Sequence, residues 1–191
     1  MRTASRILSV TAMLLFAAAA ATRAAGQDAS RYEIKIEEVK AQPAMTMRFR
    51  AKPEELGAKY AEAFGALFGY VMSNGGELAG PPFGRYHAMD EEGFEVEAGL
   101  PVSKPLAAKG EIKPSQLPGG TVATLIHVGP YERLGEAHAA LEQWLEKNSK
   151  KPAGPVWESY ITEPGGGESD PNKYETKIFL PLEAADAAKP K

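Results

Sequence analysis

The chain has 191 residues, contains no cysteine and carries a formal net charge of −3 at pH 7. Without cysteine it can form no disulfide, offer no catalytic thiolate and hold no cysteine-ligated zinc. The acidic balance argues against a nucleic-acid partner, because binding to phosphates requires a basic surface patch.

The N-terminal residues have the layout of a secretory signal peptide, which we assign to residues 1–26. Arg2 and Arg6 form a short positive region, residues 7–21 are uncharged and mostly apolar, and small residues lead to Gly26. This apolar run is too short for a membrane-spanning helix, which needs about 20 residues. We therefore expect an exported protein, periplasmic or secreted, with no membrane attachment after cleavage.

Three segments of the chain recur in the same order, which indicates an internal duplication. Residues 79–86 (AGPPFGRY) match residues 153–160 (AGPVWESY). The other matches are residues 53–57 with 131–135 and residues 94–102 with 174–182. We expect one domain over residues 32–183, with copies at about 32–108 and 109–183, and a disordered tail at residues 184–191.

Taken in chain order, each copy predicts the same run of elements. After a leading strand at residues 32–39, apolar and polar residues alternate at 45–50, as in a half-buried strand. An apolar stripe at helical spacing then covers residues 56–71, and two more strands follow, the first ending at Tyr86. The second copy repeats this order with a weak leading strand around Ile112, a strand at 122–128, a helix at 134–145, a strand ending at Tyr160 and a strand at 174–182.

This element order predicts an α+β fold. Runs of strands with one helix per copy favour an antiparallel sheet with its helices on one face. Two strand-helix-strand-strand units related by an approximate twofold axis would leave a ligand cleft between the copies, at a junction where small molecules commonly bind.

Glu158 is the candidate centre of such a site. The period of two along a strand places Glu158 and Tyr160 on one face and Trp157 on the other. The first copy keeps the tyrosine as Tyr86 but has Gly84 where the second has Glu158. One acid among aromatic side chains attracts a cationic ligand, and tyrosine faces add cation–π attraction. The alternative is an exposed glutamate on a strand face.

Four aromatic residues are the candidate walls of the pocket, and with Glu158 they form the predicted ligand-binding set. They are Tyr86, Tyr131, Trp157 and Tyr160. Tyr131 lies at a strand-to-helix junction, where it either closes one wall or packs the start of the helix. Trp157 points away from Glu158, and a large apolar residue at this position also suits core packing.

The sequence predicts no metal site and no cofactor. His87, His127 and His138 are scattered without the spacing of metal ligands. His127 lies on the strand face opposite Ile126, where we expect it to be hydrogen-bonded or exposed, with a place in the cleft as the alternative. No G-x-S-x-G nucleophile elbow occurs, so the catalytic residues of any enzyme activity are unknown apart from Glu158.

The chain resembles the GyrI-like effector-binding family over residues 32–183. The matching pieces are residues 127–132 (HVGPYE), the AGP turn followed by WESY at 157–160, and residues 178–182 (IFLPL). The resemblance implies a tandem strand-helix-strand-strand fold, a pocket between the copies and an acidic pocket residue that maps onto Glu158. The chain shows no helix-turn-helix DNA-binding segment, and its predicted export sets it apart from family members that act in the cytoplasm.

Three functions are consistent with this sequence, and none of them fixes the oligomeric state. The first is an exported, stand-alone binding protein for amphipathic or cationic aromatic small molecules, with Glu158 supplying the charge. The second is a hydrolase of reactive electrophilic small molecules, in which Glu158 orients or deprotonates water and Tyr160 or Tyr131 donates a proton. The third is a haem-binding protein, because a haem-binding family has a related duplicated fold, and it would need a suitably placed histidine or an apolar clamp.

Overall fold

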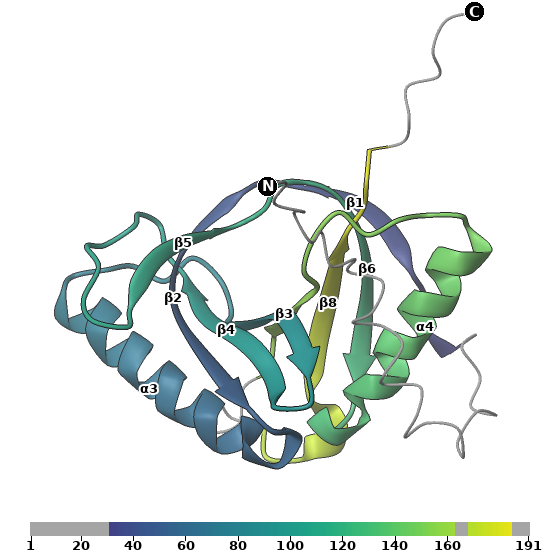
Figure 1. Ribbon diagram of the computed structural model, residues 1–191. Coiled ribbons are helices and arrows are strands. Elements are labelled where there is room, and N and C mark those ends of the chain that lie inside the picture. Colours follow the sequence, from purple (N-terminus) through teal and green to yellow (C-terminus); the bar gives the residue numbers. More distant parts are fainter. Residues whose placement is uncertain (1–30, 163–167, 185–191) are drawn as a thin grey trace, which may run out of the picture.

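The computed structural model describes residues 31–162 and 168–184, which form one eight-stranded antiparallel sheet and two long helices (Figure 1). The helices are α3 (Leu56–Ser73) and α4 (Leu134–Lys147). The strands are β1 (Lys35–Val39), β2 (Gln42–Ala51), β3 (Phe83–Asp90), β4 (Gly93–Pro101), β5 (Lys113–Leu117), β6 (Gly120–Val128), β7 (Trp157–Tyr160) and β8 (Glu175–Pro181). The predicted α+β fold class is confirmed.

The order of the strands shows how the two copies combine. Across the sheet the order is β1-β6-β8-β7-β3-β4-β2-β5, which reads the same from both ends when the copies are exchanged. The copies meet at the centre, where β3 pairs with β7, and Gly84 lies opposite Glu158. Each leading strand pairs with the other copy, because β1 joins β6 and β5 joins β2. The two halves are therefore linked at the edges as well as at the centre.

Both helices pack on the same face of the sheet. In α3 the side chains of Ala63, Leu67 and Val71 recur at intervals of four and are buried against β2 and β4. This spacing gives a helix a single apolar stripe, which stabilises it once covered by the sheet. Leu141 and Leu145 of α4 are buried in the same way over β6 and β8. Figure 1 shows the helices on the outer side of a curled sheet, α3 beside β2 and α4 beside β6.

Each helix begins in the same way, as the sequence repeat predicts. A 3-10 turn precedes it, η2 (Pro53–Glu55) before α3 and η3 (Tyr131–Arg133) before α4. Asn74 ends α3, and its side-chain amide donates to the Tyr70 carbonyl. Gly75 follows with a φ of 68°, a left-handed conformation that glycine adopts without a steric penalty.

The opposite face of the sheet also contains a buried apolar cluster. Phe83 and Trp157 lie in it together with Leu117 and Val122. The Trp157 ring stacks on Phe179 with centroids 5.0 Å apart and an interplanar angle of 6°. Both faces of the central strands are thus packed, which holds β3 and β7 rigidly in place.

Some element boundaries differ from those predicted. β3 does not end at Tyr86 but runs to Asp90, because a bulge between Tyr86 and Ala88 shifts the register and lets pairing with β4 continue. No helix in the described part of the chain is long and apolar enough to cross a membrane. The predicted signal peptide at residues 1–26 and nearly all of the predicted tail lie outside the described residues, so both stay predictions.

Candidate functional site

The centre of the helix-covered face carries the site. Residues that pair across neighbouring strands share a face of the sheet. One such row contains Met47, Ala98, Gly84, Glu158, Ile178 and Leu125. The ends of this row pack under the helices, so Glu158 lies on the helix side of the sheet, near the middle of the row and close to the pseudo-twofold axis.

Three side chains hold the Glu158 carboxylate, which is only 2 % exposed. The hydroxyls of Tyr86 and Tyr160 donate to Oε2 over 3.1 and 2.9 Å. His138 of α4 places Nε2 2.7 Å from Oε1. Burying a carboxylate without partners would be very unfavourable, and these donors stabilise its negative charge.

The pseudo-symmetry explains which residues surround Glu158. Tyr60 and His138 are each the fifth residue of their helix, and Tyr86 is matched by Tyr160. The carboxylate breaks the symmetry, since its counterpart is Gly84. Both copies therefore supply aromatic side chains to the site, while the second copy alone supplies Glu158 and His138.

Gly84 is required by the way Tyr60 packs. A Cβ at position 84 would lie 2.0 Å from the Tyr60 hydroxyl oxygen and 2.7 Å from that of Tyr160. The Tyr60 ring stacks on Phe64 and meets Phe49 edge-on, each at 5.4 Å between centroids. Its hydroxyl is buried and makes no hydrogen bond within the described residues. The phenol thus packs over the carboxylate region, close to the Tyr160 hydroxyl.

Electrostatics keep the phenols protonated. Burial, and after it the charge of Glu158, raises the pKa of Tyr60, Tyr86 and Tyr160 well above the usual tyrosine range. Around neutral pH the three hydroxyls are neutral. The phenols of Tyr86 and Tyr160 therefore serve as hydrogen-bond donors to Glu158.

The structure brings together most of the predicted site residues. Glu158, Tyr86 and Tyr160 are in direct contact. Tyr131 lies beside them, with its ring centroid 5.5 Å from that of Tyr160. Trp157 does not join this group, because it lies on the opposite face in the Phe179 stack.

Two residues of the site were missed by the sequence analysis. Tyr60 appeared only as part of an apolar stripe, and His138 only as one of three scattered histidines. The signal that could have found them is the repeat itself, since an offset of 78 aligns the two helix starts and so places Tyr60 over His138. His127, by contrast, is buried and bonded to the Tyr32 hydroxyl through Nδ1 at 2.9 Å.

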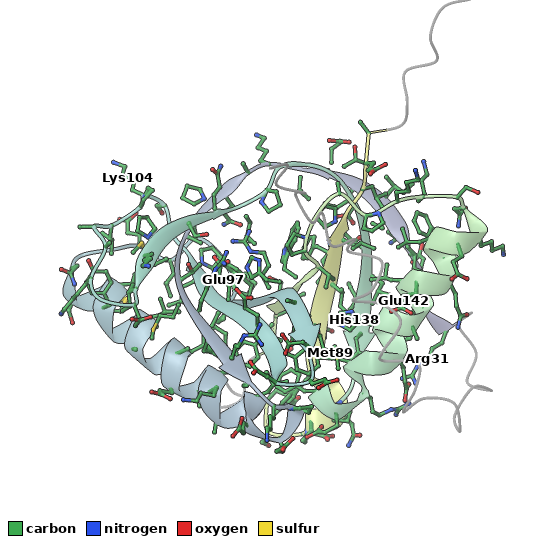
Figure 2. The ribbon with its side chains drawn as sticks, viewed as in Figure 1. Arg31, Met89, Glu97, Lys104, His138 and Glu142 are labelled. Atoms are coloured by element: carbon green, nitrogen blue, oxygen red, sulfur yellow. The ribbon has the colours of Figure 1, made fainter. Side chains whose placement is uncertain are left out.

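A second buried carboxylate, Glu97, lies on the opposite face (Figure 2). Arg85 Nη2 donates to its Oε1 over 2.7 Å, His87 Nε2 lies 2.6 Å from its Oε2, and Ser115 donates over 2.7 Å. Burial raises the pKa of Glu97, but the hydrogen bonds from His87, Arg85 and Ser115 outweigh it, so that the pKa lies well below its usual range. Glu97 is therefore a structural ion-paired acid.

Other features of the described residues do not compete with this site. No three potential metal ligands cluster in residues 31–162 and 168–184. Shallow cavities of about 380 and 510 Å³ open beside Tyr70 and beside Arg85, and neither is lined by Glu158. Glu158 is thus a buried carboxylate on the helix-covered face with no lysine or arginine partner among the described residues.

Comparison with known proteins gives one family and several solved structures. Residues 32–183 match the GyrI-like small molecule binding domain family. The C-terminal domain of EcmrR is 26 % identical with a TM-score of 0.69, covering 81 % of this chain and 99 % of that one. No curated protein sequence matches this chain.

Two more distant structures share the fold. SAV2435 bound to tetraphenylphosphonium is 11 % identical with a TM-score of 0.57, covering 80 % of this chain and 94 % of that one. A hydrolase from Listeria innocua is 17 % identical with a TM-score of 0.58, covering 79 % and 92 % of the two chains. At these identities the likeness concerns the fold alone.

Proposed function

This chain belongs to the GyrI-like small molecule binding domain family, and we propose that it is an exported, stand-alone protein that binds amphipathic cations with aromatic groups. Glu158 is the electrostatic centre of the binding site. The aromatic side chains around it contact the apolar part of the ligand. Export rests on the signal-peptide layout of residues 1–26.

The observation that carries this proposal is the contrast between the two buried carboxylates. Glu97 is neutralised by Arg85 and Arg48, at 2.7 and 3.4 Å. Glu158 has no arginine or lysine partner among the described residues, and two of its three contacts come from neutral phenols. A buried carboxylate without a permanent counter-charge favours a cation that can reach it.

The aromatic surround fits such a ligand. The rings of Tyr60, Phe64, Tyr131 and Tyr160 meet one another with centroids 5.4 to 6.1 Å apart. Aromatic faces attract cations and contact apolar groups at the same time. That SAV2435, a protein of the same fold, was solved bound to the aromatic cation tetraphenylphosphonium supports this ligand class.

Access to Glu158 requires a movement of Tyr60. Its phenol lies over Gly84 and next to Tyr160, and the carboxylate is 2 % exposed. Displacing Tyr60 breaks its ring contacts with Phe49, Phe64 and Tyr160. A ligand with aromatic groups replaces those contacts when it enters.

The test is Glu158→Gln, which keeps the shape of the side chain and removes its charge. The ligand is tetraphenylphosphonium, titrated by calorimetry into the mature protein. We expect affinity to fall at least tenfold, which is about 1.4 kcal/mol. Binding of triphenylphosphine oxide, a neutral molecule of similar shape, should change little. Glu175→Gln, an exposed acid on β8, is the matched control. Equal cation affinity in E158Q and the parent protein would refute the role of Glu158.

A second candidate function is hydrolysis of reactive electrophiles, which the contact between His138 and Glu158 favours. At 2.7 Å the carboxylate can orient the imidazole as a general base for water, while a phenol such as that of Tyr160 donates a proton. In this case E158Q should still bind substrate but lose turnover. Product formation from an electrophilic substrate, measured by mass spectrometry, separates this function from binding alone.

A further inference from the structure

His138 occupies the place beside Glu158 that a ligand cation would take. Its Nε2 lies 2.7 Å from Oε1, and its side chain is 21 % exposed. The pseudo-symmetric residue of the first copy is Tyr60, which carries no charge near neutral pH. A group that can become positive therefore lies next to a carboxylate that has no lysine or arginine partner among the described residues.

The other titratable groups near His138 do not supply a positive charge. They are Glu158 and Tyr160 from β7, Tyr86 from β3, Tyr60 from α3, and Glu142 from α4 itself. The phenols stay protonated, as described above. Glu142 lies one helical turn after His138 (Figure 2), and burial raises its pKa, while His138 lowers it to a lesser extent. His138 is thus the one residue among these groups that can neutralise Glu158.

We propose that His138 is an internal counter-ion and that a cationic ligand displaces its charge by releasing one proton to solvent. This inference rests on the proposed function, since it requires a cationic ligand. Protonated His138 and ionised Glu158 form a neutral pair that offers little attraction to a second cation. Neutral His138 leaves the negative charge of Glu158 for the ligand. The reaction exchanges one proton for one cation, and no covalent bond other than N–H changes.

The consequence is a site whose preference for cations depends on pH. Imidazole is the side chain whose charge ordinarily changes near physiological pH, so an exchange of its proton for a cation makes cation affinity depend on pH. Cation affinity rises with pH, by up to about tenfold per pH unit where a full proton is released. A neutral ligand of the same shape gains nothing from the exchange.

The experiment is calorimetry of tetraphenylphosphonium binding to the mature protein between pH 5 and 8. This cation has no titratable group, so any proton released comes from the protein. Repeating each titration in two buffers of different ionisation enthalpy gives the number of protons released per ligand. We expect proton release on binding of the cation within this pH range and none on binding of triphenylphosphine oxide.

Three variants assign the proton. His138→Gln keeps a donor for Glu158 but cannot be protonated, so cation affinity should become independent of pH. His87→Gln is the matched control, because His87 also contacts a buried carboxylate, Glu97, but on the opposite face. It should leave the pH dependence unchanged. Glu142→Gln should also keep the pH dependence, since Glu142 is not the group that releases the proton.

The outcomes separate the inference from the function on which it rests. If the cation binds with no proton release, or if H138Q keeps the parent's pH dependence, His138 is not the counter-ion although the site binds cations. If E142Q and not H138Q removes the pH dependence, the proton belongs to Glu142. If the parent protein binds neither this cation nor other aromatic cations at any pH, the proposed function fails and the inference with it.

Discussion

Gly84→Ala should both destabilise the protein and block the site. The new Cβ would lie 2.0 Å from the Tyr60 hydroxyl oxygen and 2.8 Å from the Tyr60 Cζ atom, so the ring must retreat by more than an ångström. The Tyr60 ring is held by Phe49, Phe64 and Tyr160 at centroid distances of 5.4 to 5.8 Å, and these neighbours must move with it. Overpacking of this kind costs about 1–3 kcal/mol. We expect a loss in this range, measured by urea unfolding.

A matched substitution on the other face isolates the effect on the site. Gly99→Ala in β4 would place its Cβ 2.2 Å from the Phe83 ring, which is fully buried on the opposite face. It should lower the free energy of unfolding by at least as much as G84A but leave tetraphenylphosphonium affinity unchanged below the transition. G84A should weaken that affinity several-fold, because its methyl group would lie 2.7 Å from the Tyr160 hydroxyl oxygen and fill space that the ligand enters when Tyr60 moves. If G84A is as stable as the parent, or if both variants bind equally well, the packing of Tyr60 over Gly84 is not as described.

Three further predictions concern stability. The pKa of Glu97 is lowered in the folded state, so its contribution to the free energy of unfolding is complete above its ordinary value of 4.5 and is lost as pH falls below that value. Urea unfolding between pH 6 and 2 should show this loss. E97Q removes the charged partner of the half-buried Arg85 and should cost about 3 kcal/mol at pH 7. Trp157→Phe should lower the free energy of unfolding by about 1–3 kcal/mol, because it loosens the stack on Phe179, and should leave ligand affinity unchanged. A loss of ligand affinity in this variant would show that Trp157 belongs to the binding site. Gly65→Ala in α3, where a Cβ meets nothing within 4 Å, should raise the thermal midpoint by stabilising the helix by about 0.5–1 kcal/mol.

The sequence was sufficient for features that depend on local pattern. The apolar residues from Leu56 onward recur every three or four positions, which predicts a helix with one buried face. Successive side chains of a strand point to opposite faces of the sheet, whichever strand it pairs with. The sequence alone therefore places Glu158 and Tyr160, two residues apart, on the same face. The repeat fixed the number of units and the equivalence of Tyr86 with Tyr160. The candidate centre of the site followed from these local rules.

Pairing between distant strands was decided by the tertiary structure alone. The leading strands β1 and β5 exchange partners between the copies, and no periodicity in one strand specifies which edge it joins. The same holds for the bulge after Tyr86, which carries β3 on to Asp90. Register depends on contacts between segments far apart in the sequence, which a local pattern does not contain.

The partners of Glu158 were decided in the same way. His138 and Tyr60 come from two helices that are far apart in the sequence, and neither residue is distinctive in its own segment. The sequence by itself determined an acid in an aromatic setting. Only the tertiary structure decided that Glu158 is buried against His138 while Glu97 is paired with arginine. The reason is that burial and charge pairing arise when separate elements pack, whereas period and propensity are properties of each element alone.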